Sequence, residues 1–366
     1  MMTRSSFSTS HWIVLIAVVV AGLLPEAIVP AQAARIREIV RSRLMSKADY
    51  DRMERGYYEQ ILDTGRRMDT HGLIAINTND LRESVLKPNY TTILPVGAIW
   101  NTNALAMRDQ PYSTAKPSGT FRLAMAGDSI GVGLGVDDGL GFEPVLERSL
   151  RKRSREVGGP TVEFLNFALP GKSPGQRWDH FMQVAWPTSP DVVVFEATQA
   201  DVGWDERRLV DLLPRGIGWD SAVYGDLFER SGLKKGQPKE YYAEKLAALR
   251  WDLVGEVYKH IAADCRERGV PCLWVLIPRV GRPVEPADHD RLVSLAKAAG
   301  FGAEIDISDA YDGLDPLTLA IRPADYHPNA RGHALLADRL DAAFLKQPSL
   351  QHLSARKAEG AATPRF

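Results

Sequence analysis

The chain has 366 residues, of which 45% are apolar and 25% are charged, as in an ordinary soluble globular protein. Its 45 basic and 46 acidic residues give a formal net charge of -1. That balance provides neither the basic surface that binds nucleic acid nor a polybasic patch for a membrane, so we expect no nucleic-acid partner.

The N-terminus has the pattern of an export signal. Arg4 precedes an apolar run over 12–24, and Ala31-Gln32-Ala33 follows a few residues later. A charged start, a short apolar run and an Ala-x-Ala site are typical of a secretory signal peptide, so residues 1–33 are expected to be one. An uncleaved membrane anchor, or tether, through residues 12–34 is the alternative. In both cases the rest of the chain is exported: periplasmic, secreted or anchored to the outer face of the membrane.

Residues 34–120 are expected to form an N-terminal extension of helical and irregular structure. The stretch 35–70 is charged and amphipathic, which predicts an exposed helix. The stretch 71–120 is rich in Asn, Pro and Thr, which favours loops and edge strands.

From residue 121 onward, short apolar runs alternate with helix-like stretches. The apolar runs are nearly continuous, which predicts strands buried on both faces, at 121–126, 162–168, 191–197, 272–277 and 303–307. The helix-like stretches are 141–155, 174–186, 241–268, 286–299 and 329–344. This alternation predicts one α/β domain over 121–346, built on a five-stranded parallel sheet with helices on both faces.

Three further features lie in or beyond this domain. An insertion over 203–240 contains several aromatic residues and is long enough to be a lid or a binding wall. The tail 347–366 is expected to be disordered. Cys265 and Cys272 would either form a disulfide across one turn or be buried as small apolar side chains, and the sequence leaves both open.

The segments that follow the strands carry reactive side chains. Open parallel sheets bind ligands at the carboxyl ends of their strands, so these segments should lie along one edge. In chain order they contribute Ser129, Gly171, Gln199, Asp201, Arg279, Asp325 and His327. A hydroxyl, a glycine amide, an imidazole and carboxylates therefore converge in one place.

These residue types suit acyl transfer through a serine nucleophile. Ser129 needs a base to take its proton, and His327 suits that role because imidazole is the side chain that exchanges protons near neutral pH. Asp325 would orient His327, and the amides of Ser129 and Gly171 would hold the oxyanion. Substrate contacts are expected from three residues: Asp201, Arg279 and Trp204.

A dinucleotide site is a weaker interpretation of the same region. Gly131, Gly133 and Gly135 have the spacing G-x-G-x-G, which does not fit the G-x-G-x-x-G of dinucleotide sites. Asp128 is expected to bond turn amides, and His333 to cap or pack on the last helix. We expect no cofactor and no metal.

The motifs Gly127-Asp128-Ser129, Asn166 to Gly171 and Asp325-Tyr326-His327-Pro328-Asn329 resemble, in order, the signature of SGNH/GDSL hydrolases. The resemblance covers about residues 121–346. It implies a flavodoxin-like three-layer α/β/α sandwich and hydrolysis of esters, often acetyl esters of carbohydrates, without a cofactor. The stretch 103–109 also resembles the segment before Gly-Asp-Ser in relatives of the alginate-acetylation type.

Two positions depart from the family pattern. Ala200 stands where the family usually has an asparagine that donates to the oxyanion, and losing one such donor costs about 10²–10³-fold in rate. Gln199 could substitute for it. Ala324 stands where the family usually has its aspartate, and Asp325 lies one residue closer to His327.

The sequence thus predicts a serine esterase or deacetylase that removes an acetyl or short-chain acyl group through an acyl-enzyme, from a small molecule or a carbohydrate. Two alternatives remain. One is O-acyl transfer to an envelope polysaccharide by the same residues. The other is a catalytically silent glycan-binding protein, which the loss of a donor at Ala200 keeps open.

Overall fold

The computed structural model describes residues 70–94, 96–323 and 325–354. The predicted signal peptide and the predicted helix before residue 70 lie outside the described residues. A five-stranded parallel sheet forms the centre of the fold, in the order β6-β5-β7-β8-β9. Its strands are β5 (Thr120–Ala126), β6 (Thr161–Asn166), β7 (Val192–Ala197), β8 (Cys272–Leu276) and β9 (Ala303–Asp306). The predicted five-stranded parallel sheet is confirmed, and its order is that of flavodoxin-like folds.

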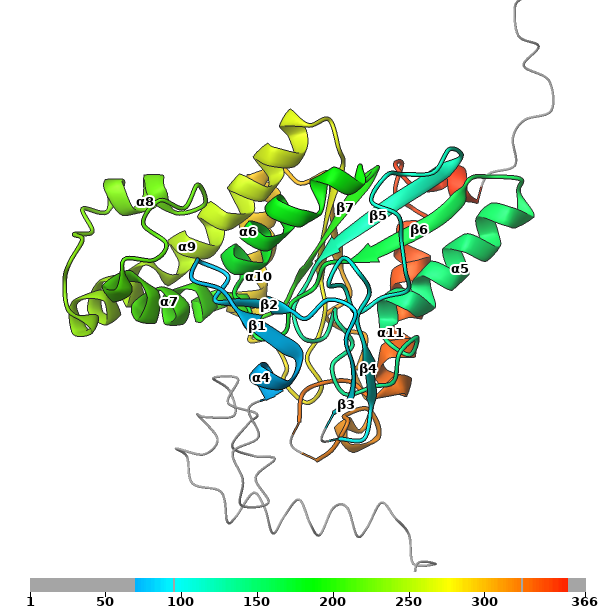
Figure 1. The fold of residues 1–366 in the computed structure, drawn as a ribbon, viewed down its shortest axis with the longest axis horizontal. Coiled ribbons are helices and arrows are strands. Elements are labelled where there is room, and N and C mark those ends of the chain that lie inside the picture. The colour runs from blue at the N-terminus through cyan, green and yellow to red at the C-terminus, as the bar shows by residue number, and fades with distance from the viewer. Residues whose placement is uncertain (1–69, 95, 324, 355–366) are drawn as a thin grey trace, which may run out of the picture.

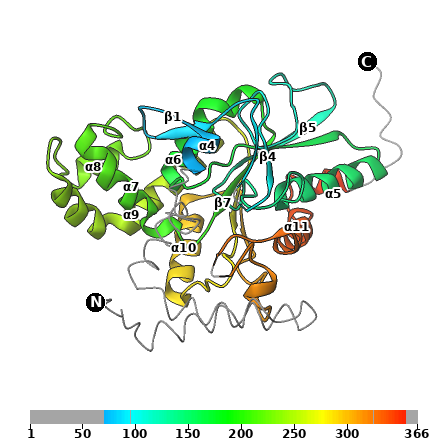
Figure 2. The same cartoon turned by 60° about the horizontal axis from the view of Figure 1, so that its bottom comes forward.

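Helices cover both faces of this sheet, as Figures 1 and 2 show. The side chains of successive strand residues point to opposite faces. Accordingly, Leu123 and Met125 of β5 pack in one apolar cluster, and Ala124 and Ala126 pack in the other. The first face is covered by α5 (Phe142–Glu156) and α11 (Ala330–Phe344), and the second by α6 (Pro174–Val184), α9 (Lys239–Glu267) and α10 (Pro286–Ala299). The predicted three-layer α/β/α fold is therefore confirmed.

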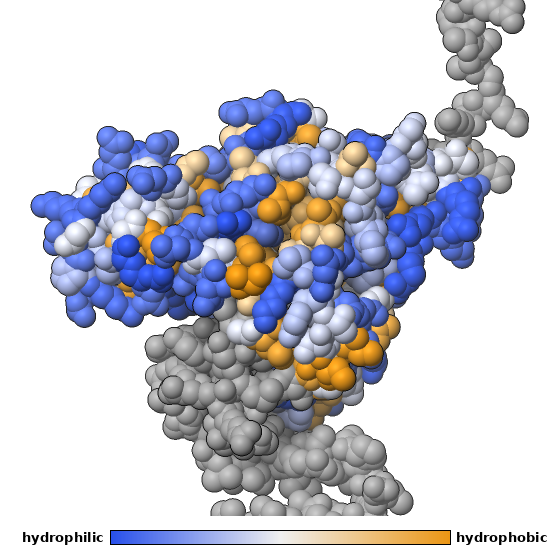
Figure 3. Space-filling model, in the orientation of Figure 1, coloured by the Kyte–Doolittle hydropathy of each residue, from blue (hydrophilic) through white to orange (hydrophobic). Residues whose placement is uncertain are grey.

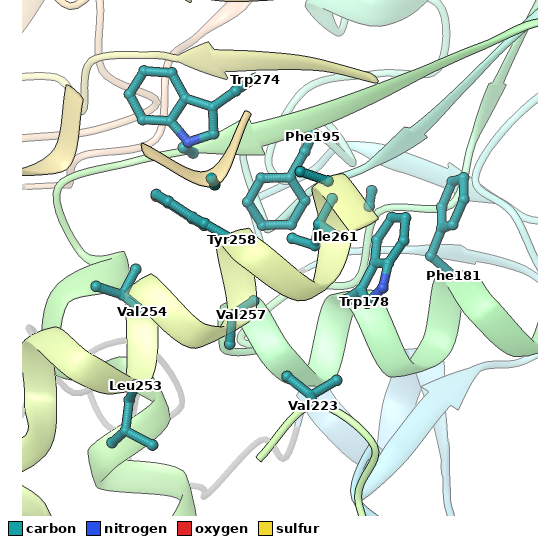
Figure 4. Close-up of a cluster of buried hydrophobic side chains, with 14 of the residues drawn as sticks. Trp178, Phe181, Phe195, Val223, Leu253, Val254, Val257, Tyr258, Ile261 and Trp274 are labelled. Carbon is teal, nitrogen blue, oxygen red and sulfur yellow. The ribbon is translucent and has the colours of Figure 1, made fainter. Parts of the chain in front are cut away.

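The insertion differs from its prediction as a lid. It contains α7 (Asp201–Leu212), the 3-10 turn η3 (Leu213–Arg215), α8 (Gly225–Arg230) and the start of α9. Tyr224 and Phe228 are fully or almost fully buried in the cluster on the second face. Figure 4 shows part of this cluster, in which Val223 of the insertion lies with Trp178 of α6 and Val257 of α9. The aromatic residues bury large apolar surfaces against α9, so the segment is a packed helical layer.

The N-terminal extension consists of a short helix and two antiparallel hairpins on one side of the main domain, in agreement with the predicted loops and edge strands. The helix is α4 (Thr70–Ile74), and the strands are β1 (Ala75–Asn77), β2 (Ser84–Leu86), β3 (Thr91–Ile93) and β4 (Ile99–Asn101). Arg108 fastens this region to the main domain, because its guanidinium donates to the carbonyls of Val132 and Gly133.

The β3–β4 hairpin also carries exposed apolar side chains. Ile93 and Ile99 are cross-strand partners and are 67% and 46% exposed. An apolar patch appears in Figure 3 at the position that this hairpin occupies in Figure 1.

The first part of the predicted disordered tail is ordered. Residues Gln351–Leu353 form the 3-10 turn η5, and Leu350 and Leu353 are fully buried against the first face of the sheet. These leucines exclude water from apolar surface that α11 leaves uncovered, which is why the chain stays attached there. The remaining 3-10 turns are η2 (Trp186–Thr188) and η4 (Pro316–Thr318).

The structure also shows the state of the two cysteines and the character of the helices. Cys265 and Cys272 are both free and buried, so the structure has the pair as apolar side chains and not as a disulfide. Within residues 70–354, apart from the two omitted positions, no helix combines the length and the apolar character needed to cross a bilayer.

Candidate active site

The segment that carries Ser129 begins where β5 ends. The chain turns there, and the amide of Val132 donates to the carbonyl of Asp128 at 3.0 Å. The side chain of Asp128 accepts from the amide of Ile130 at 2.7 Å. Asp128 is thus engaged in the turn around Ser129. We name residues 127–133 the nucleophile turn.

The segment that carries His327 is held from both sides. The amide of Ile321 donates to the carbonyl of His327 at 3.0 Å, and Ala320 and Pro328 form a bridge. Asn329 then caps α11, because its side chain accepts from the amides of Arg331 and Gly332. A rigid loop therefore delivers the imidazole to the edge of the sheet where β5 ends.

The structure brings Ser129, His327 and Asp325 together in one chain of hydrogen bonds. His327 Nε2 lies 2.8 Å from Ser129 Oγ, although the two residues are 198 positions apart. His327 Nδ1 lies 2.7 Å from Asp325 Oδ1, which also accepts from the His327 amide at 2.9 Å. All three residues are buried, with exposed fractions of 2% for Ser129, 1% for His327 and 8% for Asp325. A hydroxyl, an imidazole and a carboxylate in this order can transfer a proton away from the hydroxyl.

The carboxyl of Asp325 is stabilised as an anion. Burial on its own raises the pKa of this group, but the charge of His327 and the two hydrogen bonds from that residue outweigh burial. Arg322 adds to the effect from 3.2 Å, and together these contacts lower the pKa of Asp325 to about 2. Asp325 is therefore ionised throughout the neutral range.

Two side chains, those of Tyr326 and Arg279, stack behind the imidazole. The ring of Tyr326 stacks on that of His327, with centroids 4.4 Å apart and planes 29° apart. The guanidinium carbon of Arg279 lies 3.3 Å from the centroid of Tyr326. Arg279 is 6% exposed and lies against Tyr326, and its expected contact with substrate stays a prediction.

His333 packs against α5, as predicted. Its Nδ1 accepts from the amide of Phe142 at 3.2 Å, and the two rings stack. Burial, followed by the charges of His327 and Arg108, lowers the pKa of His333 to about 3, so the ring is neutral.

Gly171 lies in the turn after β6. It has a φ of +71°, a conformation that favours glycine, and its carbonyl accepts from Arg208 of α7 at 2.6 Å. The side-chain NH₂ of Gln199 donates one of its two hydrogens to the carbonyl of Arg282 at 2.8 Å, and its expected part in the oxyanion site stays a prediction. Ala200 provides no polar side chain, and Ala324 lies outside the described residues.

Asp201 does not fit its predicted contact with substrate, whereas the predicted contact of Trp204 stays a prediction. Asp201 is 2% exposed and forms an ion pair with Arg177 at 2.6 Å inside the protein. Burial, only partly offset by Arg177, raises the pKa of Asp201 to about 7. Trp204 is 6% exposed on α7. Both side chains belong to the interior because α7 packs against α9 and the sheet.

Sequence reasoning missed three side chains that hold this site. Arg322 contacts Asp325, and Asn166 donates to the carbonyl of Gly131 at 2.9 Å. Glu196 of β7 lies under the nucleophile turn and accepts from the amide of Asp128 at 3.3 Å. The only sequence signal for Glu196 is one acidic residue inside an otherwise apolar run.

In the part of the chain that the structure describes, no group of three or more His, Cys, Asp and Glu side chains is arranged to hold a metal ion.

Comparisons with known proteins give structural likenesses alone. No family model matches the chain. No curated protein matches it either. Among solved structures, a two-domain esterase active on acetylated mannans is 15% identical, with a TM-score of 0.38, over 68% of this chain and 53% of that protein. This chain thus matches about half the length of that esterase.

Two further solved structures are similar. The acetyl xylan esterase AlAXEase is 15% identical, with a TM-score of 0.40, over 61% of this chain and 99% of that one. A protein of the G-D-S-L family from Desulfitobacterium hafniense DCB-2 is 12% identical, with a TM-score of 0.38, over 60% of this chain and 98% of that one. The similar structures thus include esterases and a member of the family that the sequence resembles. TM-scores at or below 0.40 carry no weight for the reaction, so the geometry around Ser129 decides what this chain can do.

Proposed function

We propose that this chain is a serine hydrolase of the SGNH/GDSL type that cleaves acyl esters through an acyl-enzyme. One observation carries the proposal: His327 bridges Ser129 Oγ and Asp325 Oδ1 at 2.8 and 2.7 Å. A serine hydroxyl in this setting has a base in reach, and the base has an anion on its far nitrogen.

In the first half of the reaction, His327 Nε2 takes the hydroxyl proton as Ser129 Oγ attacks the acyl carbon. The carbonyl oxygen becomes an oxyanion, and the amides of Ser129 and Gly171 are the donors we assign to it. The tetrahedral intermediate then collapses, the ester C–O bond breaks, and the alcohol leaves with the proton from Nε2. The acyl group remains on Ser129.

In the second half, water replaces the alcohol. His327 takes a proton from the water, the resulting hydroxyl attacks the acyl carbon, and Ser129 leaves with the proton restored to Oγ. Asp325 remains ionised, holds the Nε2 lone pair toward Ser129 and stabilises the imidazolium that forms twice in each cycle. Tyr326 and Arg279 limit rotation of the ring because they stack behind it.

The oxyanion site has fewer donors than its relatives usually have. Ala200 offers no side-chain amide, and the NH₂ of Gln199 has one of its two hydrogens on the carbonyl of Arg282. We therefore infer that backbone amides supply the main stabilisation. Such a site turns over more slowly, by about 10²–10³-fold, than one with a third donor.

The substrate proposed is an acetyl or short-chain ester, on a small molecule or a carbohydrate, because that is what the sequence motifs imply. Export of the chain, and a possible tether through residues 12–34, belong to the same proposal and rest on the N-terminal sequence. A carbohydrate of the cell envelope would then be within reach.

Acyl transfer to a glycan hydroxyl is the second candidate. The contact that carries hydrolysis, His327 Nε2 at 2.8 Å from Ser129 Oγ, serves transfer equally, because the acyl-enzyme forms in the same way in both reactions. The same residues would act, and a sugar hydroxyl would replace water in the second half.

The test is hydrolysis of p-nitrophenyl acetate by the purified protein and by two serine variants. Ser129→Ala should lose activity to the uncatalysed level. Ser231→Ala is the matched control, because its hydroxyl makes only a local bond to the carbonyl of Phe228 and should leave activity unchanged. Full activity in Ser129→Ala would refute the proposal. Acetylated glycan formed when a glycan is added would favour transfer, and glycan binding without turnover would favour the silent protein.

A further inference from the structure

A buried acidic side chain that the mechanism above does not use lies directly under the nucleophile turn. Glu196 is the fifth residue of β7, next to β5 in the sheet, and is 1% exposed. Its Oε2 accepts from the amide of Asp128, the residue before Ser129, at 3.3 Å. A carboxyl group inside a sheet otherwise covered by apolar layers is costly to bury, so its contacts need a reason.

The nucleophile turn is shaped around this carboxyl group. A Cβ atom on Gly127 would lie 2.2 Å from Glu196 Oε2, and one on Gly131 would lie 2.0 Å from it. Both distances are shorter than any real contact, so only glycine fits at either end of the turn while Glu196 is in place. The turn therefore closes over the carboxyl group from both sides of Ser129.

The same carboxyl group contacts the side chain of Asp128. Burial first, then the charge of Asp128 and a hydrogen bond with its carboxyl, raises the pKa of Glu196 well above its ordinary value, and Arg177 offsets only part of this. The carboxyl groups of Glu196 and Asp128 are thus in contact, and Asp128 also accepts from the amide of Ile130 at 2.7 Å. Two carboxyl groups in contact favour the state in which they share one proton, because two adjacent negative charges repel each other.

We propose that Glu196 is a positioning residue for the nucleophile: its carboxyl group fills the space left by Gly127 and Gly131 and fixes the turn that aims Ser129 at His327. This role rests on the hydrolase function proposed above. Glu196 does not touch the reacting atoms. It acts through Asp128 and through the backbone on both sides of Ser129.

The first test compares Glu196→Gln with Glu196→Ala in the full chain, using kcat and KM for p-nitrophenyl acetate from pH 6 to 9. Glutamine can accept from the Asp128 amide and donate to its carboxylate, so kcat should stay within about threefold of wild type with the same pH profile. Alanine leaves the turn unsupported. A misplacement of about 1 Å costs about 10²-fold, so kcat should fall by about that factor, with KM changed by less than about twofold.

The second test approaches the same contact from the backbone. Gly131→Ala should lower kcat by about 10²-fold, because the added methyl group displaces the carboxyl of Glu196. Glu196→Ala placed in that variant removes the same contact, so kcat of the double variant should stay about 10²-fold below wild type and not fall by the about 10⁴-fold that independent effects would give. Gly225→Ala on α8 is the matched control, because a Cβ there meets nothing within 4 Å, and it should leave kcat unchanged.

Each outcome decides the proposal. Wild-type kcat in Glu196→Ala, or in Gly131→Ala, would overturn the positioning role. A fall in Glu196→Gln as large as in Glu196→Ala would also overturn it, because the role then needs an ionised group. If Glu196→Ala does not fold, the kcat values of Glu196→Gln and Gly131→Ala decide whether Glu196 has the positioning role. A wild-type protein without turnover and without labelling of Ser129 by a fluorophosphonate would refute the hydrolase function itself, and the role of Glu196 with it.

Discussion

Replacing Asp325 by asparagine removes the anion behind the imidazole while almost keeping its shape. In the wild-type protein the carboxylate accepts from the ring and from the amide of His327 at 2.7 and 2.9 Å, and from Arg322 at 3.2 Å. Its pKa of about 2 means that charge is present at every pH at which the protein would be assayed. Asp325→Asn therefore tests charge and tautomer together, with little change in volume.

The expected loss has two parts. A charge-assisted hydrogen bond to the imidazolium contributes about 3 kcal/mol, which corresponds to about 150-fold in rate. The amide NH₂ introduced beside Nδ1 would also favour the tautomer with the proton on Nε2, so His327 could no longer accept the proton of Ser129. Together these effects should lower kcat by about 10³–10⁴-fold.

The assay is kcat for p-nitrophenyl acetate from pH 6 to 9, with thermal unfolding of each variant measured in parallel. Asp306→Asn is the matched control. Asp306 lies 2.6 Å from His289 Nε2 at the end of β9, with β7 and β8 between this strand and β5. The Asp306→Asn variant should keep the kcat of wild type. A folded Asp325→Asn protein with kcat within tenfold of wild type would show that Asp325 does not act on His327 as described.

Three other outcomes are expected. Ala200→Asn should raise kcat by at least about tenfold if an oxyanion donor is missing there, and an unchanged kcat would show that this position does not face the oxyanion. His333 is neutral in the folded state with a pKa of about 3, so it reduces stability as pH falls from 6.5 toward 3, by up to about 1.4 kcal/mol per pH unit. His333→Asn keeps an acceptor for the amide of Phe142. Its free energy of unfolding, measured with denaturant, should therefore fall less between pH 6.5 and 4 than that of wild type. Equal falls in the two proteins would contradict the neutral ring. Leu353→Ala should reduce the free energy of unfolding by about 2–5 kcal/mol because Leu353 is fully buried, and a loss below 1 kcal/mol would show that the tail does not pack.

Much of the main domain could be predicted from the sequence because its signals are local. Strands covered on both faces are continuous apolar runs, so β5, β7 and β8 were visible with bounds correct to within one residue. Strand ends in a parallel sheet share one edge, so Ser129 and His327 could be expected together despite the 198 residues between them.

The wrong predictions concern residues whose burial depends on contacts with distant parts of the chain. Tyr224 and Leu353 stand in segments whose composition resembles loops, and only their partners on α9 and on the sheet make them interior residues. Asp201 ends a strand like a site residue, but Arg177 of α6 holds it inside the protein. The role of Glu196 depends on the close approach of two glycines of the nucleophile turn, which the sequence around Glu196 does not indicate.

The central claim is that His327 activates the hydroxyl of Ser129, and mapping the adduct of a fluorophosphonate by peptide mass spectrometry tests it most directly. A single adduct on Ser129 is predicted in the wild-type protein, with labelling lost in His327→Ala although the hydroxyl remains. An adduct on another residue, or equal labelling of Ser129 without His327, would contradict the account.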